Sequence, residues 1–212
     1  FDRQVAAFGT DIFQNGDQLV VAGAECMSTG FMLVPDQGNG AGNVIGGGDW
    51  ALDRLIPDIV MATINKKSLE IRRPNAVRPW QHVLEPLSGY LLLGQHLLEG
   101  KKEFATPFNF GPLADEDKTV ADVLSLLKNH WPEISFQVHT PKENFHEAGL
   151  LKLDCSKAAN LLKWKPIWDT SDSLRKTILW YRSFYENKRI ETQSDLTEYL
   201  RLAKEKKVVW AQ

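Results

Sequence analysis

The stretch Asn43-Val-Ile-Gly-Gly-Gly-Asp-Trp50 carries the most information about the fold of this 212-residue chain. It reads as the end of a short strand that runs into three consecutive glycines. Glycine loses more backbone freedom on folding than any other residue, so this run indicates unusual dihedral angles or a close approach to another group. In an α/β fold, a loop at the end of a strand lies where ligands usually bind. Taken by itself, the segment leaves a plain turn and a ligand-binding loop equally open.

Downstream of this stretch, strand and helix signals alternate, which predicts an α/β fold with short strands and several helices. We expect helices at 55–64, 85–99, 119–127, 156–164, 171–188 and 194–206. We expect strands at 68–71, 108–110 and 134–138. Thr119-x-x-Asp122 is a capping-box pattern that opens its helix. Five side chains of the second helix are expected to point inward: Leu87, Tyr90, Leu91, Leu97 and Leu98.

The chain divides into three parts by the character of its sequence. Residues 1–40 differ from the rest and remain an unassigned N-terminal segment, in which 18–22 and 31–34 are candidate short strands. Residues 41–190 form the main α/β portion. Residues 191–212 form a charged helical tail, which we expect to be loosely attached.

Composition excludes several broad classes of function. Lys and Arg total 25 against 27 Asp and Glu, so the net charge of −2 argues against nucleic-acid or membrane-surface binding. No apolar run is long enough to span a membrane. Cys26 and Cys155 match no metal or redox spacing, which favours reduced thiols in a cytoplasmic protein. Because the chain begins with Phe1 and no signal peptide is visible, we expect it to be a piece of a longer protein.

A second segment, 71–82, places three arginines within seven positions and includes two prolines. Arginine forks match phosphate oxygens in bidentate fashion, and a diphosphate would use two of them. A solvated charged loop is an equally good reading of this segment alone. Trp80 and His82, which follow the arginines, are expected to pack rather than to take part in chemistry.

A third segment carries His146 beside Glu147 and leads toward Asp154 and Ser156. No third ligand lies at metal spacing from this pair, so a metal site is not expected. Asp154 or Ser156 is expected to cap the helix that follows. Neither a G-x-S-x-G elbow nor a Cys–His pairing occurs. Residue types and spacing alone therefore reach an α/β protein with a phosphate-binding loop.

In combination, these segments resemble the CDP-glucose 4,6-dehydratases, which are NAD-dependent enzymes of the extended short-chain dehydrogenase/reductase (SDR) class. Residues 42–58 resemble the mid-chain signature of that family, and residues 78–90 resemble its next block. Four shorter matches follow in the family's order: Asn109–Pro112, His146–Ala148, Leu151–Lys157 and Trp180–Tyr181. The resemblance covers residues 41 to about 188. It implies an incomplete Rossmann-like extended SDR fold, represented by its C-terminal substrate-binding portion.

The resemblance also implies roles for matched residues. Asn43 would contact the diphosphate or the sugar beside the nicotinamide. Leu55 and Pro57 would line the pocket for the nucleotide base. Arg78 would bind the diphosphate, with Arg72 nearby, which agrees with the argument from guanidinium geometry.

The substrate pocket would be completed by Asn109, His146 and Glu147. In the family, NAD⁺ oxidises the sugar at C4, water leaves across C5 and C6, and the hydride returns to C6. The product, CDP-4-dehydro-6-deoxy-glucose, is a precursor for surface polysaccharide biosynthesis. The implied partners are therefore a CDP-hexose and, as in the family, a second copy of the chain in a homo-oligomer.

Two features of the family are absent from this sequence. One is the strand, glycine-rich turn and helix that hold NAD. The other is the catalytic Tyr-x-x-x-Lys pair: the four positions that lie four residues after a tyrosine hold Gly94, Tyr185, Arg189 and Ala203. We therefore assign no catalytic residue and expect no turnover by the chain alone.

A truncated, frameshifted or fused reading frame that joins the family pattern near residues 38–42 would explain both absences. The alternative is a non-catalytic nucleotide-sugar-binding fragment or assembly partner that is active only when complemented. A related activity such as epimerisation is less favoured, because the Gly-Gly-Gly-Asp-Trp block is specific to the dehydratases.

Overall fold

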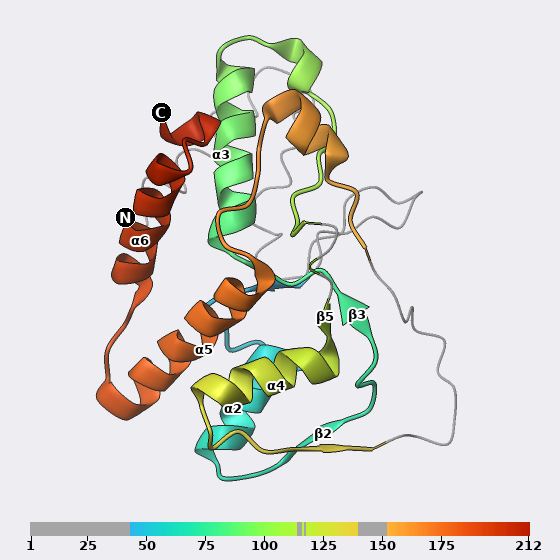
Figure 1. The fold of residues 1–212 in the computed structure, drawn as a ribbon, viewed down its shortest axis with the longest axis vertical. Helices are drawn as coiled ribbons and strands as arrows, with labels where there is room; N and C mark the ends of the chain where they lie inside the picture. The colour runs from blue at the N-terminus through green and yellow to red at the C-terminus, as the bar shows by residue number, and fades with distance from the viewer. Residues whose placement is uncertain (1–42, 114–115, 117, 140–151) are drawn as a thin grey trace.

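The computed structural model describes residues 43–113, 116, 118–139 and 152–212, and Figure 1 shows them as a ribbon. The strands are β1 (Val44–Ile45), β2 (Leu69–Ile71), β3 (Val77–Arg78), β4 (Gln81–His82), β5 (Lys118–Thr119) and β6 (Phe136–Val138). The α-helices are α2 (Leu55–Ile64), α3 (Leu84–Leu98), α4 (Val120–His130), α5 (Thr170–Asn187) and α6 (Thr192–Glu205). Shorter turns of helix are η3 (Lys102–Phe104), the π-helix η4 (Ala158–Leu162) and η5 (Val209–Ala211).

The strands pair two at a time. β1 pairs with β4 and β2 pairs with β6, both in parallel, whereas β3 pairs with β5 in antiparallel fashion. Parallel strands need a crossover connection, and helix α2 lies between β1 and β4 in the chain. The prediction of an α/β fold with short strands and several helices is therefore confirmed.

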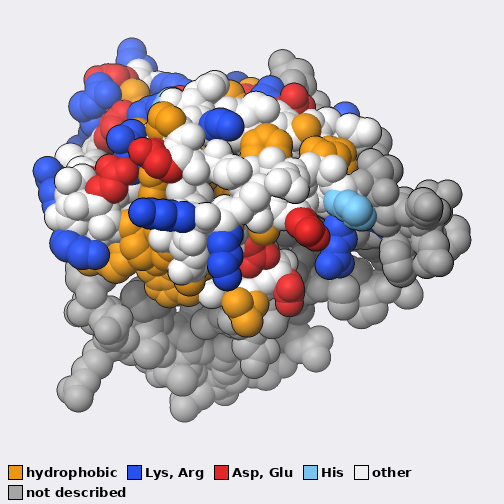
Figure 2. Space-filling model, turned by 90° about the horizontal axis from the view of Figure 1, so that it is seen from below, with side chains coloured by type: hydrophobic (Ala, Val, Ile, Leu, Met, Phe, Trp, Pro, Cys, Tyr) orange, Lys and Arg blue, Asp and Glu red, His pale blue; other side chains and the backbone are white. Residues whose placement is uncertain are grey.

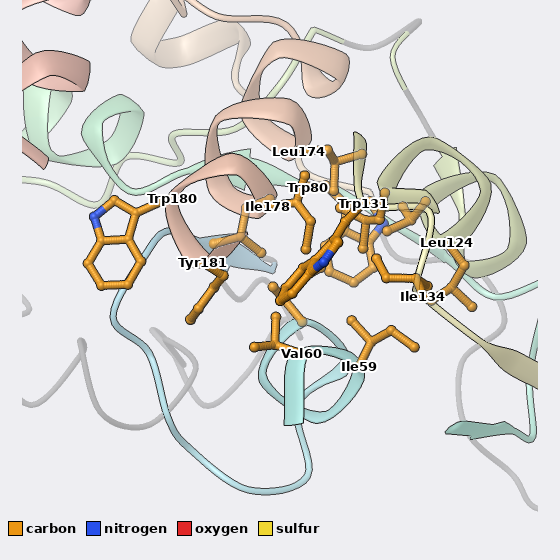
Figure 3. Close-up of a cluster of buried hydrophobic side chains, with 14 of the residues drawn as sticks. Ile59, Val60, Trp80, Leu124, Trp131, Ile134, Leu174, Ile178, Trp180 and Tyr181 are labelled. Carbon is orange, nitrogen blue, oxygen red and sulfur yellow. The ribbon is translucent and has the colours of Figure 1, made fainter. Parts of the chain in front are cut away.

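The largest core lies among α2, α4 and α5, which pack together in the lower half of Figure 1. Helix α2 contributes Ile59 and Val60, and both are fully buried. They meet apolar side chains of α4 and α5, together with Trp80 and Trp131, as Figure 3 shows. The apolar spacing that predicts helix 55–64 is thus the spacing that fills this core.

Two smaller cores hold the upper half of the molecule together. Phe110, Leu162 and Trp164 pack against Leu92 of α3. Tyr199 of α6 packs with Trp168, and their rings meet edge to face at 5.1 Å between centroids. Aromatic pairs in this geometry stabilise a fold beyond the area that they bury.

The ends of the helices follow the signals in the sequence. Thr119 Oγ1 accepts a hydrogen bond from the backbone N–H of Asp122 at 3.1 Å, and Asp122 Oδ2 accepts one from the backbone N–H of Thr119 at 3.0 Å. This confirms the predicted capping box of α4. Asp154 Oδ1 accepts from the backbone N–H of Ser156 at 2.9 Å, as expected for the start of the next helical segment.

Helix α3 presents a different face to the core from the predicted one. Leu91 and Leu98 are 76% and 71% exposed, so their expected inward orientation is wrong. The buried residues of α3 include Glu85 and Leu92, and Gly89 lets the ring of Phe110 approach the helix. Several leucines in succession fit two helical faces almost equally well, which is why the pattern misassigned the inward one.

Three other predictions are corrected. Residues 108–110 form no strand, and Phe110 is instead a buried ring between α3 and Trp164. The helix expected over 156–164 ends at Leu162 in a π-helical turn. Helix α6 is packed rather than loosely attached, because Tyr199 and Ala203 are buried. The expected strands at 18–22 and 31–34 lie outside the described residues.

Candidate functional site

The glycine loop, Gly46–Gly48, connects β1 to the segment that leads into α2. A Cβ atom on Gly47 would lie 2.0 Å from Cδ2 of Trp180, so the indole ring of α5 occupies the space beside this glycine. Gly48 has φ of +87°, a backbone conformation that favours glycine. Both glycines thus have structural reasons within the chain, which favours a packed turn over a ligand loop.

Hydrogen bonds hold Asp49, the residue that follows the glycine loop, in place. The Tyr181 hydroxyl donates to the carbonyl of Asp49 at 2.6 Å and accepts from the N–H of Asp49 at 3.0 Å. The carboxylate of Asp49 pairs with Arg54 at 3.2 Å, at the N-terminus of α2. Burial beside Asp49 raises the pKa of Tyr181. Tyr181 is therefore a neutral anchor rather than a base.

Three predicted contact residues lie near the glycine loop. Asn43 directly precedes β1, and Leu55 and Pro57 lie at the start of α2. The carbonyl of Asn43 accepts from the N–H of Gln81 at 3.3 Å, so the β1–β4 ladder places Asn43 next to the segment after β3. Leu55 and Pro57 lie in the first turn of α2, where Pro57 is buried and Leu55 is half-buried against the main core. Through this backbone hydrogen bond, Asn43 lies next to the segment that directly follows Arg78.

The two arginines expected at a diphosphate lie in different local structures, one in a bend and one in a strand. Arg72 is exposed in the bend after β2. Arg78 is half-buried in β3, where its Nη1 donates to the carbonyl of Val77 at 2.9 Å. Lys118 of β5, and not Arg72, lies opposite Arg78 in the ladder.

The side chain of Asn109 is hydrogen-bonded to the segment that contains Asp154. Its side-chain amide donates to the carbonyl of Asp154 at 3.1 Å. A Cβ on the neighbouring Gly111 would lie 3.1 Å from Leu153, so the two segments run close together. His146 and Glu147 lie outside the described residues.

Glu85 forms a buried polar centre that sequence reasoning missed. Its carboxylate accepts from the backbone N–H groups of Ile167 at 2.9 Å and Trp168 at 2.8 Å, and from the Tyr199 hydroxyl at 2.8 Å. Burial nevertheless raises the pKa of Glu85 from 4.5 to about 7. An acidic residue in the first turn of a helix normally faces solvent, so nothing in the local sequence indicates burial.

His82 and Trp80 pack, as expected. Both are buried, and the His82 ring meets Trp168 edge to face at 4.8 Å between centroids. Burial, with a smaller contribution from the charge of Lys176, lowers the pKa of His82 to about 3. A histidine that stays neutral throughout the ordinary pH range serves packing, not proton transfer. Within the ranges that the structure describes, no three metal-ligating side chains come together.

An apolar surface lies beside the glycine loop. Trp50, Leu52 and Met61 are 45%, 82% and 42% exposed. The Trp50 ring lies 5.2 Å from that of Tyr181, measured between centroids. Figure 2, seen from the side where α2 and β2 lie in Figure 1, shows hydrophobic side chains gathered between charged ones. Exposed apolar side chains that cluster in this way mark interaction surfaces.

A search of curated proteins finds a CDP-glucose 4,6-dehydratase of Salmonella typhimurium (strain LT2) that is 41% identical over 162 residues, or 76% of this chain. The chain is a homologue of that dehydratase. The match covers 45% of the relative, so the chain spans less than half of its length. No family model matches the sequence.

Solved structures share the fold. UDP-glucuronic acid 4-epimerase from Bacillus cereus, in complex with UDP-glucuronic acid and NAD, is 20% identical, with a TM-score of 0.55 over 68% of this chain and 44% of that one. dTDP-glucose 4,6-dehydratase from Bacillus anthracis str. Ames, in complex with NAD, is 20% identical, with a TM-score of 0.52 over 66% of this chain and 42% of that one. The chain therefore shares its fold with part of each of these enzymes.

The described residues of this CDP-glucose 4,6-dehydratase homologue do not fit NAD at the glycine loop. A dinucleotide fingerprint leads directly into a helix whose N–H groups face the pyrophosphate. Here the space beside Gly47 is filled by Trp180, and α2 begins only at Leu55. The glycine loop therefore provides no cradle for the cofactor.

Proposed function

We propose that this chain is the nucleotide-sugar-binding portion of a CDP-glucose 4,6-dehydratase, with CDP-glucose as its ligand. The observation that carries the proposal is the 41% identity to the Salmonella typhimurium enzyme over 162 residues. Nucleotide sugars also appear in structures that share the fold, including one with UDP-glucuronic acid and one with UDP-glucose. Fold alone does not decide the nucleotide, so cytidine rests on the curated relative.

We propose the individual contacts from the residues that match the family. Arg78 would bind the diphosphate, and Arg72 would reach the same ligand from the bend after β2. The first turn of α2, with Leu55 and Pro57, would contact the base. Asn43 would contact the diphosphate or the sugar from its place beside β4.

On the other side of the ligand we propose Asn109, His146 and Glu147. The bond from Asn109 to Asp154 supports the choice of Asn109, because it brings together two segments that match the family, Asn109–Pro112 and Leu151–Lys157. Substitution of Asn109 by Ala should weaken CDP-glucose binding several-fold, whereas Asn129→Ala on the exposed side of α4 should leave it unchanged.

We further propose that the chain does not turn over CDP-glucose alone. The family uses a tyrosine whose pKa a nearby lysine lowers, and no tyrosine of this sequence has its lysine in register. Purified chain should be incubated with NAD and CDP-glucose, and the 4-keto product sought by mass spectrometry. Product formed at a rate above that of a heat-denatured control would overturn this part of the proposal.

A second candidate function is assembly with a complementary polypeptide, in which this chain is one part of an active complex. The exposed Trp50, Leu52 and Met61 favour it, because large apolar side chains at a surface stabilise an interface when covered. The test is to add the part of the Salmonella typhimurium enzyme that this chain does not match and to assay the mixture. Activity from the mixture, absent from either part, would support assembly.

A further inference from the structure

Asn109 lies in an irregular loop. Within the described ranges, residues 107–113 form neither a helix nor a strand, so no backbone ladder sets the direction of the Asn109 side chain. The next residue, Phe110, is buried against α3 and fixes one side of the loop. A binding residue on a loop is placed precisely only where neighbouring side chains hold it. The orientation of Asn109 therefore depends on side-chain contacts of the residues around it.

Lys157 contacts all three residues that directly precede Asn109. Its ammonium group donates hydrogen bonds to the hydroxyl of Thr106 and, at 2.8 Å, to the carbonyl of Pro107. It also lies over the ring of Phe108, 4.5 Å from the centroid. An ammonium carries three donors, and hydrogen bonds from a charged donor are stronger than neutral ones. A single side chain thus holds three consecutive residues of the loop.

The core fixes the position of Lys157 itself. Lys157 directly precedes η4, whose Ala158 and Leu162 are buried in the same core as Phe110. This short helix lies beside α3 in the upper half of Figure 1. The Lys157 side chain therefore connects a packed element to an irregular loop.

The same two segments also meet at and beyond Asn109. The side-chain amide of Asn109 donates to the carbonyl of Asp154 at 3.1 Å. A Cβ on Gly111 would lie 3.1 Å from Leu153 and 3.2 Å from the thiol sulfur of Cys155. The loop is thus in contact with the segment before η4 on both sides of Asn109.

We propose that Lys157 is a positioning residue of the nucleotide-sugar site and that it acts through Asn109. The inference rests on the proposed function and deepens it. By holding residues 106–108 against the start of η4, Lys157 sets the orientation in which the Asn109 amide meets the ligand. Lys157 would not contact the ligand, because its ammonium faces the loop.

The test measures the affinity of the full chain for CDP-glucose by isothermal titration calorimetry. Lys157→Met keeps a long side chain but removes the charge and the donors, whereas Lys157→Arg keeps both. Thr106→Val removes one acceptor from the other side of the contact. Lys165→Met is the matched control, because Lys165 is exposed. Thermal melting of each variant shows whether it is folded.

We expect Lys157→Met to weaken CDP-glucose binding about fivefold, close to the effect of one lost hydrogen bond. Lys157→Arg should restore most of the affinity, because arginine also donates several hydrogen bonds and lies over aromatic rings. Thr106→Val should give a smaller loss, and Lys165→Met should match wild type. Unchanged affinity in folded Lys157→Met would overturn the inference; if that variant does not fold, unchanged affinity in Thr106→Val would overturn it.

A double variant shows whether Lys157 acts through Asn109. Asn109→Ala combined with Lys157→Met should bind CDP-glucose as Asn109→Ala does alone, because residues that act as one unit are not additive. Two losses that multiply would mean that Lys157 acts independently of Asn109, which contradicts the inference.

The proposed function can fail separately, so the last measurement needs no ligand. The side-chain amide of Asn109 gives a pair of signals in heteronuclear NMR spectra, identified by its absence from Asn109→Ala. Lys157→Met should move this pair toward the position of a solvent-exposed asparagine, and Lys165→Met should not. If the folded wild type bound no CDP-glucose, the proposed function would be overturned. A moved pair would then still support the positioning of Asn109 by Lys157, and an unmoved pair would overturn it.

Discussion

The glycine loop and the β3–β5 ladder differ in the side chains that they carry. At the glycine loop, the space that a ligand would need beside Gly47 is filled by Trp180, and Tyr181 ties the next residue to α5. At the ladder, Arg78 of β3 is half-buried and lies opposite Lys118 of β5. The more distinctive sequence thus serves packing, whereas the ladder carries Arg78, the residue that we propose binds the diphosphate.

This difference shows what kind of evidence assigns a binding residue. A rare pattern such as three consecutive glycines indicates only that side chains are not tolerated at those positions. Whether the reason is a ligand or another part of the chain depends on contacts between distant segments.

The largest expected effect tests the packing role of the glycine loop. Gly47→Ala would place a methyl group 2.0 Å from the Trp180 ring, so the turn or the indole must move. Overpacking of this severity should lower the free energy of unfolding by about 3 kcal/mol. Urea denaturation followed by tryptophan fluorescence measures the change.

Gly94→Ala provides the control for that substitution. Gly94 lies inside α3, and nothing lies within 4 Å of an added Cβ. The change should stabilise the chain by roughly 0.5–1 kcal/mol, because alanine favours a helix. If Gly47→Ala were tolerated as well as Gly94→Ala, the glycine loop would not be a packed turn, and a ligand role would return.

A second prediction concerns the buried carboxylate of Glu85. Its pKa in the folded chain is about 7, above the 4.5 of an exposed carboxyl, so the folded chain keeps this proton to higher pH. The stabilising contribution is complete below about pH 4.5 and is lost as the pH rises through 7. Between pH 5 and 8 the contribution should fall by about 2 kcal/mol. Denaturation across this range measures it.

Glu85→Gln isolates that contribution, because glutamine does not titrate. His82 acts in the opposite direction below pH 6.5, since its folded pKa of about 3 makes the unfolded chain bind the extra proton. The difference between the profiles of wild type and Glu85→Gln removes the effect of His82. A difference that stayed constant from pH 5 to 8 would contradict the assignment.

The smallest expected effect concerns the α4 cap, which directly follows β5. Thr119→Ala removes the side-chain acceptor for the N–H of Asp122 and should cost about 1 kcal/mol. Ser125→Ala, at an exposed position within α4, should cost less than roughly 0.5 kcal/mol. Urea denaturation of both variants measures the difference, and equal losses of stability would contradict the role of the Thr119 cap.

Local features of the fold could be predicted from the sequence. Helix α2 follows from the spacing of apolar residues, and the α4 cap follows from Thr119 and Asp122. Packing between distant segments could not be predicted in the same way. The exposed Leu91 and the buried Glu85 both depend on which side of α3 meets Trp168 and Tyr199.

The candidate site was predictable only in part, for the same reason. Arg78 was selected because arginine matches phosphate, a property of the residue type. Lys118 is an ordinary lysine in the sequence, and only the structure shows that it lies opposite Arg78. The register of a two-residue ladder depends on how the chain returns from Leu84 to Val120, which local patterns do not specify.

The most direct test of the central claim is a calorimetric titration of the folded wild-type chain with CDP-glucose, alongside UDP-glucose and cytidine. Saturable binding with one site per chain, weaker for both comparison ligands and lost in Arg78→Ala, is the predicted result. A folded chain that gave no binding heat with CDP-glucose at millimolar concentration would contradict the account.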